Sequence, residues 1–254
     1  MGLSVVIITK NEALNLAPCL ESVAFADELV VVDSGSTDGT LQIAQSFGAK
    51  ILQTPDWPGF GRQKNRAVDM ATQDWILSID ADERIGPVLR DEIMATMASP
   101  THKVYALNRR SSYCGQTMNH SGWYPDPVVR LFQRGAARFS DDLVHESLRT
   151  SLPIGALQGP MAHLSFRNLE SVLDKVNRYS TAGAQALANK GKSASLGKAL
   201  LHGFWAFFRT YVVRRGFLDG RMGLVLAISN AEGTYYRYLK LWLLQRPVDE
   251  KEPA

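Results

Sequence analysis

The sequence predicts an α/β protein with a mostly parallel sheet and helices on both faces. Three continuous apolar runs predict its central strands: residues 3–9 (LSVVIIT) and the openings of 28–40 and 75–85. Such runs are typical of strands that are buried on both faces. Between these runs, apolar residues recur at helical spacing, so helices are expected between the strands. Strands that alternate with helices form parallel sheets.

Each further element follows from a local signal. Residues 11–24 place leucines at roughly helical spacing, and 38–48 begin at Asp38, a candidate N-cap, and end at Gly48. The next predicted elements, in order, are a strand in 49–54, a helix in 61–71, the strand that opens 75–85 and a helix in 86–98. Residues 100–165 are irregular, which indicates short β-strands and long loops.

Pattern and charge both change near residue 168. Residues 1–174 hold 15 Lys and Arg against 20 Asp and Glu, whereas 175–246 hold 12 against 2 and are helical in pattern. We therefore predict a catalytic domain over 1–167 and a basic helical region over 168–254. A basic region of this kind favours a polyanionic partner.

Several classes of protein lack support in the sequence. With 45% hydrophobic residues the chain can bury a core, and it contains no run of 18 apolar residues. Lys10, Asn11 and Glu12 interrupt the first apolar stretch, so we expect that this stretch is not a signal peptide. Neither a G-x-G-x-x-G after the first strand nor a P-loop occurs, which argues against dinucleotide oxidoreductases and P-loop NTPases. Cys19 and Cys114 form no disulfide framework and fit a reducing cytosol as small, buried residues.

The stretch WILSIDADERI ends a buried strand in three carboxylates, Asp80, Asp82 and Glu83. Like charges this close repel, so a positive partner is expected. Residues i and i+2 of an extended segment point the same way, so Asp80 and Asp82 together predict a site for Mg²⁺ or Mn²⁺ and a diphosphate. The alternative is a solvated acidic turn.

Asp33 stands at the end of the second strand, in VVVDSGSTDGT. Carboxylates at this place in α/β sheets bind a ribose hydroxyl or a base N–H, and ligands of such sheets lie at the carboxyl ends of the strands. Thr9 and Asp80 lie at two further strand ends. The alternative for Asp33 is capping of its own turn.

Three stretches, VVIITKNEALNLAPCLESV, ELVVVDSGSTDGT and WILSIDADERI, resemble the family 2 glycosyltransferases in order and spacing. The intervening GFGRQKNRAVDMATQDW resembles the basic-Asn helix of that family. The resemblance implies a GT-A fold, which binds nucleotide sugars, and an inverting transfer of a sugar from a nucleotide diphosphate to a hydroxyl.

The resemblance also implies roles for single residues. It puts Thr9 and Glu12 beside base and ribose, Asp33 on uracil, Arg62 on base or diphosphate, Asp80 on the ribose or metal side, and Asp82 on the metal. A solvated position is the alternative for Arg62 and is the expectation for Lys64 and Arg66. Asn65 is expected to cap or to bridge within the site.

An inverting transfer needs a base within reach of the acceptor hydroxyl. Glu146, in VHE, matches the carboxylate that the family places after the metal strand, and Asp126, Asp141 and Asp142 are alternatives. His163 is a candidate third metal ligand or diphosphate contact; a partly buried histidine with a satisfied ring is the alternative.

The second half resembles the bacterial lipopolysaccharide-core β-1,4-glucosyltransferases, through WYPDPVVRLFQRG, DDLVHESL, MAHLSFRN and the tail RTYVVRRGFLDGRMGLVLAISNAEGTYYRYLK. This implies UDP-glucose as donor and the first heptose of the inner core as acceptor. Another glycan or lipid-carrier acceptor, a nucleotidyltransferase and a sugar- or nucleotide-binding module are the rivals. Nucleic-acid binding is the rival function for the basic tail, but no recognised nucleic-acid-binding motif accompanies it.

The tail from 168 to 246 places aromatic and aliphatic residues beside cations, in LGKALLHGFWAFFRTYVVRR. We expect a cytoplasmic enzyme, peripheral at the inner face of the cytoplasmic membrane, whose tail docks on anionic lipid. The alternative is that these aromatics pack as ordinary core.

Overall fold

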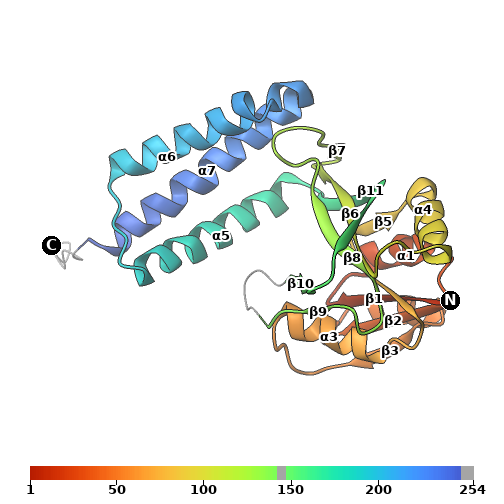
Figure 1. Cartoon of the computed structure of the whole chain (residues 1–254). Helices are drawn as coiled ribbons and strands as arrows, with labels where there is room; N and C mark the ends of the chain where they lie inside the picture. Colours follow the sequence, from red (N-terminus) through yellow and green to blue (C-terminus); the bar gives the residue numbers. More distant parts are fainter. Residues whose placement is uncertain (142–146, 247–254) are drawn as a thin grey trace. The chain divides into compact units, whose positions relative to one another are not determined.

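The protein forms two compact units in a computed structural model that describes residues 1–141 and 147–246 (Figure 1). The first unit contains Met1–Arg110 and Pro125–Leu164, and the second contains Ser111–Tyr124 and the chain from Ser165 onward. The second unit thus includes residues 111–124, which do not belong to the helical region predicted over 168–254.

The first unit has a parallel half-sheet in the order β3-β2-β1-β4. Its strands are β1 (Leu3–Thr9), β2 (Glu28–Asp33), β3 (Lys50–Gln53) and β4 (Trp75–Ser78). The helices between and after them are α1 (Ala13–Ser22), α2 (Thr40–Ser46), α3 (Phe60–Met70) and α4 (Pro87–Ala98). All eight elements occur where the sequence predicts them, and the α/β class is confirmed.

An antiparallel half continues the same sheet in the order β4-β8-β6-β11-β5. Its strands are β5 (Glu83–Ile85), β6 (Val104–Tyr113), β8 (Pro127–Gln133) and β11 (Ile154–Phe166), and a small separate ladder joins β9 (Arg138–Phe139) to β10 (Leu148–Arg149). The sheet is therefore mixed rather than mostly parallel, because the segment predicted as irregular supplies long strands.

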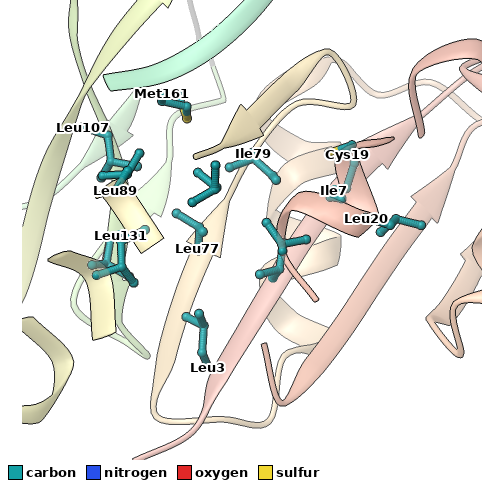
Figure 2. Packing of buried hydrophobic residues seen from close by; sticks show 14 of the residues in the cluster. Leu3, Ile7, Cys19, Leu20, Leu77, Ile79, Leu89, Leu107, Leu131 and Met161 are labelled. Atoms are coloured by element: carbon teal, nitrogen blue, oxygen red, sulfur yellow. The ribbon is translucent and has the colours of Figure 1, made fainter. Parts of the chain in front are cut away.

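Two apolar cores confirm that helices cover both faces of this sheet. Ile7 of β1 and Leu77 of β4 share one core with Leu20 of α1 (Figure 2), whereas Val6 lies in the other core with Val68 of α3. This division follows from the strand, in which successive side chains point to opposite faces. The polar ends of the strands are thereby held by a rigid, buried scaffold.

The second unit is helical, as predicted. It contains α5 (Leu169–Asn189), α6 (Leu196–Phe208), a π-helical turn (Arg209–Val213), a 3-10 turn (Gly216–Asp219) and α7 (Gly220–Leu244), and β7 (Gln116–Thr117) pairs with the end of β6. Its core includes Tyr113, Met118, Val172 and Leu226. Within the described residues, none of the helices has both the length and the apolar composition that crossing a bilayer requires.

Candidate active site

The acidic end of β4 is neutralised by two cations of the protein itself. Asp80 receives Lys64 of α3 on Oδ1 at 3.0 Å and Arg130 of β8 on Oδ2 at 2.6 Å. Burial opposes ionisation of Asp80, but the charges of Arg130 and Lys64 outweigh it and hold the pKa of Asp80 well below its usual range. The positive partner expected for this cluster of carboxylates is therefore supplied, at Asp80, by the side chains of Lys64 and Arg130.

Arg130 also holds the third carboxylate of the cluster. Its Nη2 lies 2.7 Å from Oε1 of Glu83, which is fully buried, while Arg109 approaches the same oxygen at 3.8 Å. Burial, together with the charge of Asp80, raises the pKa of Glu83 in spite of Arg130. The backbone N–H of Asp80 donates to Oε2 of Glu83 at 2.9 Å, so Glu83 fixes the turn that carries Asp80.

Lys64 belongs to the site, so the expectation that this lysine is solvated is wrong. Only 5% of Lys64 is exposed, and its Nζ also lies 5.4 Å above the ring of Phe139. On a helix, positions three and four apart share a face, and Lys64 shares its face with the buried residues Ala67 and Val68. That apolar stripe is the signal in the sequence by which its inward orientation was detectable.

Asp82 is placed differently from Asp80 and lies beside His163 of β11. Nε2 of His163 is 3.4 Å from Oδ2 of Asp82, and the backbone N–H of Leu164 donates to the Asp82 carbonyl at 2.9 Å. The pairing of β11 with β5, in which His163 faces Glu83, brings the histidine to this end of the sheet. The two residues that the sequence assigns to a metal are therefore adjacent.

The donor set of Asp82 and His163 suits Mg²⁺ or Mn²⁺ chemically, since carboxylate oxygen and imidazole nitrogen both bind Mn²⁺-type ions. In residues 1–141 and 147–246, no group of three or more His, Cys, Asp or Glu side chains is arranged around a common point for a metal. An ion here would thus take two protein ligands and fill its other positions with water and diphosphate oxygens, as Mg²⁺ commonly does.

Asp33 is completely buried at the end of β2 and accepts four hydrogen bonds. Thr9 Oγ1 donates to it at 2.9 Å, and the backbone N–H groups of Gly35 and Ser36 donate at 3.0 and 2.8 Å, with the Ser36 hydroxyl as the fourth donor. These contacts are those of a residue that caps its own turn, the alternative predicted for Asp33. Two of the four donors are hydroxyls, which can rotate away from the carboxylate and free it for another donor. Binding of the nucleotide by Asp33 stays a prediction.

The other predicted nucleotide contacts surround this turn or lie on α3. Glu12 precedes α1 and accepts from Asn15 Nδ2 at 2.7 Å, while its own N–H donates to Thr40 Oγ1 at 2.8 Å. Arg62 is exposed, with Nε 3.5 Å from Oδ1 of Asp141, an arrangement that leaves its guanidinium accessible. Asn65 exchanges two hydrogen bonds of 3.0 Å with the backbone of Phe139, which is the bridging role expected for it.

The candidate base Glu146 lies outside the described residues, as does Asp142. Of the alternatives that are described, Asp126 binds Arg109 through two contacts of 2.8 Å, and Asp141 is the partner of Arg62. Asp126 is thereby tied into an ion pair with Arg109, rather than with Arg130 or Arg134.

The arrangement as a whole is a cluster of charged and polar side chains at the carboxyl ends of parallel strands, the edge at which α/β sheets bind their ligands. The model of the family Glycosyl transferase family 2 matches residues 4–145, which include every strand-end residue described above. The chain is a family 2 glycosyltransferase.

This glycosyltransferase is similar to curated proteins over nearly its whole length. An uncharacterised glycosyltransferase of Rickettsia typhi is 32% identical over 252 residues, which cover 94% of this chain and 86% of that protein. The lipopolysaccharide core biosynthesis glycosyltransferase LpsC of Rhizobium meliloti is 31% identical over 258 residues, covering 94% of this chain and 93% of LpsC.

Solved structures show the fold to which the glycosyltransferase belongs. The crystal structure of S. aureus TarS in complex with UDP-GlcNAc superimposes with a TM-score of 0.51 at 18% identity, covering 92% of this chain and 80% of that one. The complex of TarS with UDP gives the same TM-score at 17% identity and covers 100% of this chain. These similarities confirm the predicted GT-A fold.

Proposed function

We propose that the protein transfers glucose from UDP-glucose to a heptose of the lipopolysaccharide inner core, with inversion at the anomeric carbon and with a bound Mg²⁺ or Mn²⁺. The observation that carries the proposal is the end of β4, where Asp82 adjoins His163 while Asp80 is held ionised by Lys64 and Arg130. The similarity to LpsC along nearly the entire chain supports a lipopolysaccharide-core acceptor, and TarS, with the same fold, is a UDP-GlcNAc complex.

Each carboxylate at this edge has its own task in the proposed reaction. Asp80, fixed from both sides by cations, is an oriented anion that accepts hydrogen bonds from the hydroxyls of a ribose. Asp82 and His163 would hold the metal, which when bound neutralises the negative charge on the departing diphosphate. The two aspartates differ in their partners, two cations for Asp80 and a histidine for Asp82, and this difference would let two carboxylates so close in sequence serve two ligands.

Glu146 is the proposed base, on the strength of its position in the sequence. It would take the proton of the heptose hydroxyl as that oxygen bonds to the anomeric carbon, while the bond from this carbon to the diphosphate breaks and UDP leaves with the electron pair. The site is proposed to work at the inner face of the cytoplasmic membrane, where a lipid-anchored acceptor would be met.

The test is an assay of the purified protein with a panel of nucleotide sugars, Mg²⁺ or Mn²⁺, and lipopolysaccharide truncated after the inner-core heptoses. We expect glucose transfer and UDP release with UDP-glucose, and loss of both with a chelator. Transfer to another glycan, or from another donor, would redirect the substrate assignment within the family. Release of pyrophosphate in place of UDP would identify a nucleotidyltransferase and overturn the proposal.

A further inference from the structure

The turn between α6 and α7, residues 209–219, exposes an unusual set of side chains; we refer to it as the hairpin tip. Val212, Val213, Phe217 and Leu218 are 44%, 57%, 49% and 54% exposed. Apolar residues scattered singly over a surface need no explanation, but a contiguous group indicates an interaction surface. Here four of them lie within seven residues.

The backbone of the hairpin tip is fixed from within the second unit, so these side chains are not exposed by a loose loop. The N–H of Arg214 donates to the Arg209 carbonyl at 2.8 Å, which closes the π-helical turn, and Arg215 follows in the left-handed conformation with a φ of 54°. π-helical turns and left-handed non-glycine residues cost free energy and cluster at functional sites.

Two buried residues anchor the hairpin tip. Asp219 is 5% exposed and accepts from the Asn119 backbone N–H and from the Ser121 hydroxyl, each at 2.9 Å. Gly216 lies so close to Thr210 that a Cβ on it would stand 2.7 Å from the Thr210 carbonyl oxygen. The interior of the turn is therefore tightly specified, while its outward face is apolar.

The apolar surface continues from the hairpin tip along one face of α6. Leu200, Phe204 and Phe208 are spaced by four residues, as are Leu201 and Trp205, so they form one helical stripe. All five are exposed, from 38% for Phe208 to 67% for Leu201 and Phe204. Within the second unit, therefore, these five side chains are not part of the core.

Cations accompany this surface along residues 196–228, a stretch that the structure describes in full and that exposes no acidic side chain. Arg209, Arg214, Arg215 and Arg221 are all exposed, and the only acidic residue from 196 to 228 is the buried Asp219. An apolar face rimmed by arginine is complementary to a bilayer with anionic headgroups, where each Lys or Arg contributes about 1 kcal/mol, or about fivefold in binding. Another protein surface would not require this sign of charge.

We propose that the hairpin tip and the stripe on α6 dock on an anionic phospholipid bilayer. Phe217 and Leu218 enter the boundary between headgroups and acyl chains, and Arg214 and Arg215 bind lipid phosphates. The inference deepens the proposed function, since it rests on that function for the lipid-anchored acceptor and names the surface that reaches it. Its test measures vesicle binding rather than transfer, so the two fail separately.

The experiment is flotation of the full chain with vesicles of phosphatidylcholine alone and of phosphatidylcholine mixed with phosphatidylglycerol, at low and high salt. We expect binding to the anionic vesicles that weakens with salt, and a loss of about tenfold or more in F217S/L218S. The matched control is L243S/L244S, which removes two apolar side chains of similar exposure, 51% and 59%, from the other end of α7 and should bind as the parent does. Circular dichroism confirms that each variant is folded.

A second readout separates docking from self-association. The chain has five tryptophans, so the readout is the difference in emission between L218W and its parent, which should shift to the blue only when anionic vesicles are added. Failure of the parent to float with anionic vesicles at low salt would overturn the proposal, as would equal losses in F217S/L218S and L243S/L244S. A dimer in light scattering that becomes a monomer in F217S/L218S, without vesicle binding, would assign the surface to a second copy of the chain and would also overturn it.

Discussion

Replacing Arg130 by Met tests the charge arrangement at the end of β4 directly. Methionine keeps much of the side-chain volume but removes the cation that joins Asp80 and Glu83. The side chains of Arg130 and Glu83 are 7% and 0% exposed, so water cannot replace the lost partner of Glu83. Asp80 keeps Lys64 and is 31% exposed, which makes its share of the loss smaller.

The magnitude follows from the geometry. Two unit charges about 4 Å apart interact by about 4 kcal/mol at an effective dielectric constant of about 20. We discount the contact with Asp80 for solvent screening and assign the loss mainly to Glu83. Removing one partner of a buried pair costs about 3–5 kcal/mol, so the free energy of unfolding of R130M should fall by about that amount.

The loss in R130M should depend on pH, because the pKa of Glu83 is already raised and rises further without Arg130. The folded variant then holds a proton that the unfolded chain, with a carboxyl pKa near its ordinary value of 4.5, releases. A state that binds more protons is favoured at low pH, so R130M should be markedly less stable at about pH 8 than at about pH 5. Urea unfolding followed by tryptophan fluorescence measures this.

Two further variants act as controls for R130M. The double variant E83Q/R130M should lose the added pH dependence, since the group that titrates is gone. R138M removes an arginine that is 59% exposed and paired with Asp69 at 2.7 Å, and it should cost no more than about 1 kcal/mol. A loss in R130M as small as that in R138M, or one that is equal at both pH values, would refute the argument.

The other predictions concern catalysis and nucleotide binding. D82A should lower UDP release by about 10²-fold or more without unfolding, and near-normal turnover at every metal concentration, limiting as well as saturating, would show that Asp82 is not a ligand. D33N keeps the turn, because the new amide can donate to the Thr9 and Ser36 hydroxyls, but calorimetry should find UDP affinity about tenfold lower; unchanged affinity would leave Asp33 as a turn cap alone. E146Q should lose about 10²-fold in transfer while still binding UDP-glucose, whereas an active E146Q and an inactive D142N would move the base to Asp142.

Much of the fold was predictable because the buried parallel strands have strong local signals. Leu3–Thr9 and Trp75–Ser78 are continuous apolar runs, and the polar residues that follow them mark the edge of the sheet where ligands bind. Asp82 and His163, assigned to one metal from sequence, do lie side by side. They are more than eighty residues apart in sequence, and His163 was a candidate because imidazole suits Mn²⁺-type ions, not because any periodicity links the two residues.

The antiparallel strands were harder to predict, since small residues conceal their alternation. Along Ile154–Phe166 the inward positions include Gly155 and Gly159 as well as Leu157 and Met161. The inward position 159 has no room for a side chain, because a Cβ on Gly159 would stand 2.9 Å from the Cα of Leu89 in α4. Close packing of a helix on the strand therefore replaces the large apolar residues that mark a strand in sequence.

Lys64 and Arg130 were missed for a different reason. Lys64 is flanked by the polar residues Gln63 and Asn65, whereas Arg130 stands between Val129 and Leu131, and lysine and arginine side chains are usually solvated whatever their neighbours. What buries them is a contact with Asp80, which is distant in sequence and supplies the compensating charge only in the folded sheet. The spacing of Lys64 from Ala67 and Val68 indicates its inward orientation, but no period or spacing in a single sequence identifies the carboxylate with which it pairs.

Because Arg130 lies on β8, the charge arrangement at the end of β4 can be completed only after β8 has been synthesised. A growing chain that ends before Pro127 already carries β4 with Asp80, Asp82 and Glu83, but not the arginine that bridges two of these carboxylates. Domains form from the N-terminus as they are made, so the parallel half of the sheet can assemble first. The acidic turn then lacks the arginine that joins Asp80 and Glu83 until β8 has been translated and has paired with β4. The charge arrangement around Asp80 is in this way withheld from the nascent chain until about half of it has been made.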